Sequence, residues 1–161
     1  VRSSAASDVY KRQGRDKMIE LVEDRLDIDT YLELRQSVQF RELTRDQAKK
    51  GLSNSLYTLV AFKDGKAVGM GRIVGDGAII CYVQDLIIRP EVQGEGIGGL
   101  ILETLKKFVI QEGYEGTTMM FDLMCAKGRE EFYKKHGFIA RPTKDLGPGM
   151  IQFIQIGSDE Q

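Results

Sequence analysis

Runs of apolar residues at alternating or consecutive positions predict extended strands along most of this chain. We expect strands at residues 18–24, in two runs within 55–77, and at residues 78–88, 117–125, 138–142 and 150–156. The two runs within 55–77 flank Asp64 and Gly65, and an Asp-Gly pair in that position is the strongest short signal for a β-hairpin. The first half of the sheet is therefore predicted to be an antiparallel meander.

Apolar residues at helical spacing predict four helices between these strands. The helices are expected at residues 29–40, 43–52, 97–112 and 128–136. Thr44 stands three residues before Gln47, which is the pattern of a capping box at the start of the second helix. Gly113 follows the last apolar position of the third helix and is the expected C-cap.

Residues 18–156 carry this regular pattern and are predicted to form one domain. Residues 1–17 have no hydrophobic period and are expected to be a disordered or artefactual leader, and residues 157–161 a disordered tail. The formal net charge of -1 gives no support for nucleic acid or an anionic membrane as a partner. Two cysteines are too few for a disulfide framework or a zinc cluster, so we expect no metal and a cytoplasmic location.

A glycine-rich loop precedes the third helix and fits two phosphate-binding patterns. Gly94, Gly96 and Gly99 match G-x-G-x-x-G, whereas Gln93, Gly96 and Gly98 match Q-x-x-G-x-G. A dinucleotide fold would begin with this loop and continue through parallel strand–helix units, but here a meander comes first. The second pattern needs only a strand, free amides and a helix N-terminus that binds a phosphate. A further alternative is that the glycines merely turn the chain into the helix.

The segments QDLIIRPEVQGEGIGGLILETL and EEFYKKHGFIARP resemble the acetyl-CoA-binding segment and the following helix and strand of the GNAT acetyltransferase superfamily. The resemblance covers essentially residues 18–156. It implies an α/β (α+β) fold with a mixed, mostly antiparallel central sheet flanked by helices. It also implies that an acetyl group passes directly from acetyl-CoA to an amine.

The same resemblance assigns the residues that would hold acetyl-CoA. Backbone amides of the glycine loop would bind the pyrophosphate, and the backbone of the preceding strand would pair with pantetheine. These cofactor-binding residues are Leu86, Ile87, Ile88, Gln93, Gly94, Glu95, Gly96, Ile97, Gly98 and Gly99. The amide of Leu86 would donate to the thioester oxygen, and the side chain of Glu95 is expected to point away.

Two side chains are the candidate catalytic residues. Tyr133 matches the family tyrosine that protonates the leaving sulfur, and a phenol with a pKa near 10 can still donate at neutral pH. Asp85 is the candidate base, acting through water or by attracting a cationic substrate; equally, it could be a structural carboxylate that ties down a strand bulge. Gln84 stands where polyamine acetyltransferases often carry a carboxylate, which weakens a polyamine assignment.

The acceptor is expected to be the primary amine of a small molecule. Arginines and lysines on the first two helices disfavour a polycation, whereas Asp122 and Asp145 favour a cation. The alternatives are a peptide or protein acceptor, or a sensor module that binds acetyl-CoA without turnover. A homodimer is possible by analogy with the family.

Overall fold

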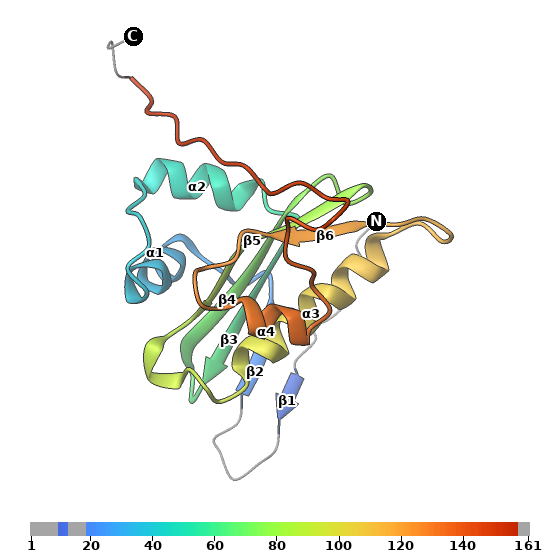
Figure 1. The fold of residues 1–161 in the computed structure, drawn as a ribbon. Coiled ribbons are helices and arrows are strands. Elements are labelled where there is room, and N and C mark those ends of the chain that lie inside the picture. The colour runs from blue at the N-terminus through green and yellow to red at the C-terminus, as the bar shows by residue number, and fades with distance from the viewer. Residues whose placement is uncertain (1–9, 13–18, 158–161) are drawn as a thin grey trace. The chain divides into compact units, whose positions relative to one another are not determined.

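The computed structural model describes residues 10–12 and 19–157 of the chain (Figure 1). These residues divide into two compact units, one ending at Leu123 and the other beginning at Met124, and each is described by itself. The first unit contains, in chain order, β1 (Tyr10–Arg12), β2 (Ile19–Glu23), α1 (Ile28–Ser37), α2 (Arg45–Ser53), β3 (Tyr57–Lys63), β4 (Lys66–Gly75), β5 (Ile80–Ile88), the 3₁₀ helix η1 (Pro90–Val92), α3 (Ile97–Glu112) and β6 (Met120–Leu123). In the second unit the described residues form one helix, α4 (Glu130–Lys135).

The six strands form one sheet in the order β1-β2-β3-β4-β5-β6. Neighbours pair antiparallel up to β5, and only β5 and β6 run parallel. The β3–β4 hairpin turns at Asp64 and Gly65, which have φ angles of 51° and 76°. Two successive positive φ angles give the tight turn that an Asp-Gly pair favours. The mostly antiparallel sheet flanked by helices is confirmed.

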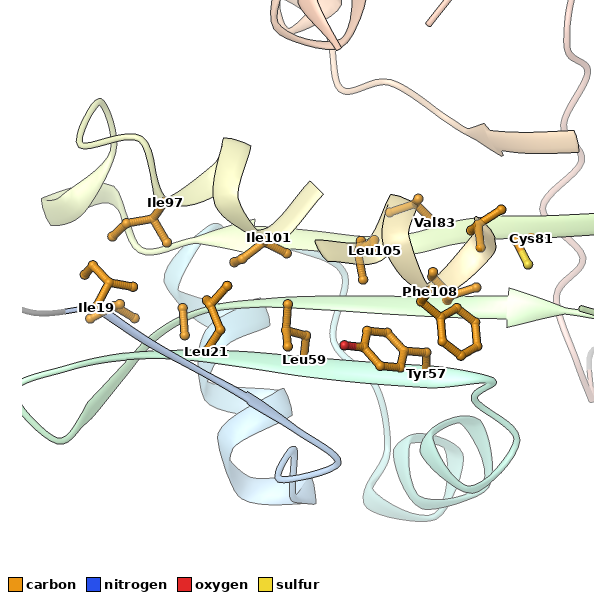
Figure 2. Close-up of a cluster of buried hydrophobic side chains, with 14 of the residues drawn as sticks. Ile19, Leu21, Tyr57, Leu59, Cys81, Val83, Ile97, Ile101, Leu105 and Phe108 are labelled. Carbon is orange, nitrogen blue, oxygen red and sulfur yellow. The ribbon is translucent and has the colours of Figure 1, made fainter. Parts of the chain in front are cut away.

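One face of the sheet packs against α3 and forms the larger hydrophobic core (Figure 2). Ile97, Ile101 and Leu105 are at most 1% exposed and lie on the side of α3 that meets the strands. Tyr57 of β3 stacks on Phe108 of α3, with ring centroids 4.4 Å apart. Burial of this apolar stripe fixes the direction of α3 relative to the strands.

The opposite face packs against α1 and α2. Tyr31 and Leu34 of α1 are fully buried in a second cluster with Met70 and Ile87 of the sheet. Both helices begin with the side-chain caps that short helices need. The carboxylate of Asp27 accepts a hydrogen bond from the Thr30 amide at 2.7 Å, and the hydroxyl oxygen of Thr44 accepts one from the Gln47 amide at 3.1 Å. The start of α2 at Thr44, which the capping-box pattern predicts, is confirmed.

The two closing strands expected at residues 138–142 and 150–156 are wrong, since the described residues of the second unit contain no strand. In residues 150–156 the apolar residues occupy odd and even positions alike, so a strand there would present them on both faces. A strand also needs a neighbouring backbone to pair with. Ile151, Phe153 and Ile154 are 66%, 69% and 70% exposed.

The ends of the chain were expected to lie outside the domain. Residues 10–12 of the expected leader pair with β2 as the edge strand β1. The remainder of residues 1–17 lies outside the described residues, as do residues 158–161 of the expected tail.

Candidate active site

β5 extends beyond β6 and leaves part of one edge without a strand partner. The parallel ladder ends at the pair of Val83 and Leu123, whereas β5 continues to Ile88. Among the described residues, the stretch 84–88 pairs with a strand only on its β4 side. Leu86, Ile87 and Ile88, the predicted pantetheine-binding residues, lie in this stretch. An extended ligand could hydrogen-bond to it as an additional strand would.

A β-bulge at Gln84 sets the direction of the side chains along this edge. Val83 pairs with Ile73 and Asp85 pairs with Arg72, so Gln84 is the extra residue and has no partner in β4. Val83 packs in the α3 core, and after the bulge Leu86 packs against that core as well. Asp85 is thereby turned to the opposite face, where it bonds to α1. Because of this one inserted residue, Asp85 lies on the face covered by α1, whereas Leu86 lies on the face covered by α3.

The glycine loop carries the chain from β5 into α3. The side-chain amide of Gln93 donates to the carbonyl oxygen of Ile88 at 3.0 Å and so fixes the start of the loop. Gly94 and Gly96 both have φ angles of 85°, a conformation that residues with a Cβ rarely adopt. Gly96 is the N-cap of α3 and provides no side-chain cap. These two positions explain why glycine, rather than any small residue, is needed here.

The first turn of α3 offers amides that the helix itself leaves without acceptors. Its first helical residues are Ile97, Gly98 and Gly99, and the first backbone bond of the turn is from the Leu100 amide to the Gly96 carbonyl at 3.3 Å. The positive end of the helix dipole lies at the same place. This end of α3 has the properties of a phosphate-binding site.

Glu95 would oppose an anion at this loop, but its charge is paired. The Lys63 ammonium at the end of β3 donates to the Glu95 carboxylate. The Lys63 and Glu95 side chains are only 18% and 34% exposed, so solvent screens the pair incompletely. The loop therefore presents backbone amides without a net negative side-chain charge.

Two glycines of β4 allow α3 to approach the sheet closely. A Cβ added at Gly71 would lie 2.7 Å from Cγ2 of Ile101, and one added at Gly69 would lie 3.3 Å from Cδ1 of Ile101. Both distances are shorter than non-bonded carbons prefer. The missing Cβ atoms thus set the height of α3 above β4 and β5, and with it the position of the α3 amides relative to the open edge.

Asp85 is almost completely buried and is held by three donors. The Tyr31 hydroxyl donates to Oδ2 at 2.8 Å, Nε of Arg72 donates to Oδ2 at 3.0 Å, and Nη1 of Arg35 donates to Oδ1 at 3.2 Å. The carboxylate side chain is 1% exposed. Burial, followed by the nearby Asp85 charge, raises the pKa of Tyr31. The cluster joins α1 to β4 and β5.

Arg72 extends the same cluster to α2. Its Nη1 donates to the carbonyl oxygen of Gly51 at 3.2 Å and to the hydroxyl of Ser55 at 3.1 Å. Sequence reasoning missed Arg72, although a charged residue inside the apolar run MGRIV was an available signal. The bond between Tyr31 and Asp85 was not foreseen either.

Tyr133 lies on α4 in the second unit. Its ring contacts Phe132 and Phe138 edge-on, at centroid distances of 5.0 and 5.7 Å. Burial, and to a lesser extent the neighbouring Cys125, raises the pKa of Tyr133 to about 12. The phenol therefore remains protonated throughout the neutral range and can act as a hydrogen-bond or proton donor.

A sequence profile described as the acetyltransferase (GNAT) domain matches residues 54–140, more than half of the chain. The chain belongs to the GNAT acetyltransferase family.

The relatives of this chain differ in length, and a solved structure shares its fold. The uncharacterized N-acetyltransferase ycf52 of Pyropia yezoensis is 26% identical over 158 residues, which cover 88% of this chain and 87% of that protein. The chloroplastic GCN5-related N-acetyltransferase 2 of Arabidopsis thaliana is 29% identical over 80 residues, or 50% of this chain, but the match spans only 30% of that relative. A probable acetyltransferase from meticillin-resistant Staphylococcus aureus, SA2161, has a crystal structure with a TM-score of 0.75 and 28% identity, covering 85% of this chain and 100% of its own.

The part of this GNAT chain that the structure describes contains neither a metal-binding cluster nor a membrane-spanning helix. No group of three or more His, Cys, Asp and Glu side chains is arranged there to hold a metal ion. None of the helices in these residues is long and apolar enough to cross a membrane.

Proposed function

We propose that this GNAT chain transfers the acetyl group of acetyl-CoA to the primary amine of a small molecule. The observation that carries the proposal is the run of chain that leads from the open edge of β5, at residues 84–88, to the uncapped start of α3. One part of this run suits an extended amide-containing chain and the other suits a phosphate, as in the two halves of acetyl-CoA.

The residues present fit acetyl-CoA in detail. The amides of the glycine loop and of Ile97 and Gly98 would bind the pyrophosphate, and the Lys63 charge offsets the repulsion from Glu95. The backbone of residues 86–88 would pair with the pantetheine amides. When bound, acetyl-CoA supplies a thioester carbonyl that an amine can attack and a sulfur that leaves with a negative charge. The Leu86 amide would donate to the carbonyl oxygen as negative charge develops there.

Tyr133 is proposed as the group that donates to the leaving sulfur. Its raised pKa keeps the hydroxyl hydrogen in place at neutral pH. A phenol with a pKa near 12 is also a weaker acid than a thiol, whose ordinary pKa is about 8.5. The main contribution of Tyr133 is therefore a hydrogen bond that stabilises the departing thiolate, and water can complete the protonation.

Of the roles that the sequence leaves open for Asp85, the contacts favour a structural one. The Asp85 carboxylate accepts hydrogen bonds from Arg72, Arg35 and Tyr31, and it supplies the negative charge beside two largely buried guanidinium groups. We therefore propose Asp85 as a positioning residue that holds α1 against the bulge of β5. We also propose that the protein is cytoplasmic and forms a homodimer.

The test is release of free CoA thiol from acetyl-CoA across alkylamines, arylalkylamines, aminosugars, amino acids and short peptides. Tyr133→Phe should lower kcat by on the order of a hundredfold with little change in KM for acetyl-CoA. Tyr114→Phe is the matched control, because it removes the same hydroxyl from a residue that is 73% exposed. Turnover with peptides alone would favour a protein acceptor. Acetyl-CoA binding without amine-dependent release would favour a sensor and refute the enzyme.

A further inference from the structure

Asp122 lies on the face of the sheet that α1 covers. Its neighbours in β6, Phe121 and Leu123, pack against the α3 core. Side chains alternate along a strand, so Asp122 points to the opposite face. Its register partner in β5 is Tyr82, and side chains paired across adjacent strands lie about 5 Å apart on one face. An aromatic side chain and a carboxylate are therefore neighbours here.

Unlike Asp85, Asp122 has a carboxylate oxygen without a partner. Its Oδ1 atom is buried, and among the residues that the structure describes none forms a hydrogen bond with it. Burial raises the pKa of Asp122, and the backbone amide of the same residue opposes the effect in part. A buried carboxylate oxygen without a hydrogen-bond donor is costly, and native folds rarely retain one without a use, even where the rest of the side chain is only half-buried, as it is in Asp122. A positively charged hydrogen-bond donor would satisfy the Oδ1 atom of Asp122.

Asp122 lies close to the open edge of β5. The last ladder pair, Val83 with Leu123, is one residue further along, and the unpaired stretch 84–88 begins immediately beyond it. Asp85, the other carboxylate on this face, follows Tyr82 by three residues, or roughly 10 Å along the strand. Because Asp85 is already bonded to Arg72 and Arg35, it offers little to a second cation.

We propose that Asp122 binds the ammonium group of the acceptor, so that the substrates are cationic alkylamines rather than amines that are neutral at pH 7. The inference rests on the proposed acetyltransferase function and specifies its acceptor. The carboxylate accepts hydrogen bonds from the ammonium group, and the ring of Tyr82 provides an aromatic surface beside it. The bound ammonium group releases one proton to water before its nitrogen attacks the thioester carbonyl. Gln84, at the bulge, carries no charge and adds polarity only.

The experiment compares Asp122→Asn with the parent protein, using benzylamine as the cationic acceptor and aniline as the neutral one. The KM for benzylamine should rise at least tenfold in the variant, and the KM for aniline should stay within about twofold. Glu103→Gln removes the same charge from an exposed position on α3, on the other side of the sheet, and should change neither value. Equal changes for both amines, or none, would overturn the proposal.

A binding measurement separates this inference from the proposed function. Benzylamine should raise the melting temperature of the parent more than benzyl alcohol does, and Asp122→Asn should abolish the difference. This result with no turnover in the parent would refute the enzyme and support the ammonium site. The variant itself should melt at the same or a higher temperature than the parent, because it removes a charge that the fold does not neutralise. A clearly lower melting temperature would show that Asp122 has a structural partner and would overturn the proposal.

Discussion

Replacement of Gly71 by alanine tests whether the height of α3 above the sheet positions the proposed phosphate site. The added Cβ would lie 2.7 Å from Cγ2 of Ile101 and 3.0 Å from Cδ1 of Leu105. Carbon atoms in contact prefer about 3.5–4.0 Å, so the shortfall at Ile101 is roughly 1 Å. The χ1 angle of isoleucine is restricted in a helix. The relief must therefore come from a movement of α3 or of β4.

Overpacking of this kind costs about 1–3 kcal/mol, partly offset by about 0.4–1 kcal/mol from the lower entropy of the unfolded chain. We expect Gly71→Ala to lower the melting temperature by roughly 3–8 °C. A displacement of about 1 Å at the amides of α3 should raise the KM for acetyl-CoA on the order of tenfold or more. Thermal unfolding and initial-rate kinetics measure the two effects on one preparation.

Gly51→Ala is the matched control for this substitution. A Cβ at Gly51 would meet only Nη2 of Arg72, at an ordinary contact distance of 3.8 Å. Since Gly51 lies within α2, alanine should stabilise the fold by about 0.5–1 kcal/mol and leave the KM for acetyl-CoA unchanged. If Gly71→Ala behaved like this control, the close approach of α3 would not be what positions the amides.

Three further predictions concern charge and protonation. Lys63→Met should raise the KM for acetyl-CoA several-fold, which corresponds to a loss of binding free energy on the order of 1 kcal/mol. Adding Glu95→Gln to this variant should restore the KM. Strictly additive effects of the two substitutions in a double-mutant cycle would contradict the pairing of Lys63 with Glu95. The pKa of Tyr31 is raised in the fold, so the stabilisation from this residue is complete below about pH 10 and is lost as the pH rises through the folded pKa. Urea unfolding between about pH 9 and 11.5 should show this loss in the parent protein, and Tyr31→Phe should not show it. At neutral pH the variant should be about 1–2 kcal/mol less stable than the parent, because it lacks the bond to Asp85. Because the pKa of Tyr133 is about 12, kcat should show no fall from its ionisation up to about pH 10.5, and a tyrosine-dependent fall near pH 10 would contradict the environment described for it.

The elements that the sequence predicted well are those encoded within a few residues. The N-cap at Thr44, the hairpin turn at Asp64 and the C-cap at Gly113 each depend on the chemistry of one short stretch, and each lies where it was expected. The apolar stripe from Ile97 onward likewise fixed the limits of α3. Local signals of this kind need no knowledge of distant parts of the chain.

The elements that the sequence could not predict depend on distant partners. The bulge at Gln84 exists only in the register between β4 and β5, and one slipped residue changes the face on which Asp85 lies. The bond between Tyr31 and Asp85 joins residues 54 positions apart. Residues 150–156 failed as a strand for the related reason that apolar residues alone do not supply a neighbouring backbone.

Asp85 and Asp122 show how the fold gives two similar side chains different tasks. Both carboxylates lie on the face of the sheet that α1 covers, and neither is distinguished by its immediate sequence. Asp85 accepts hydrogen bonds from two guanidinium groups and a phenol, and these bonds hold α1 against β4 and β5. Among the described residues, Asp122 forms no ion pair, and it keeps an unpaired buried oxygen beside the open edge of β5. A carboxylate that the protein leaves unsatisfied can still bind an incoming cation, and this difference assigns stability to Asp85 and recognition of the acceptor to Asp122.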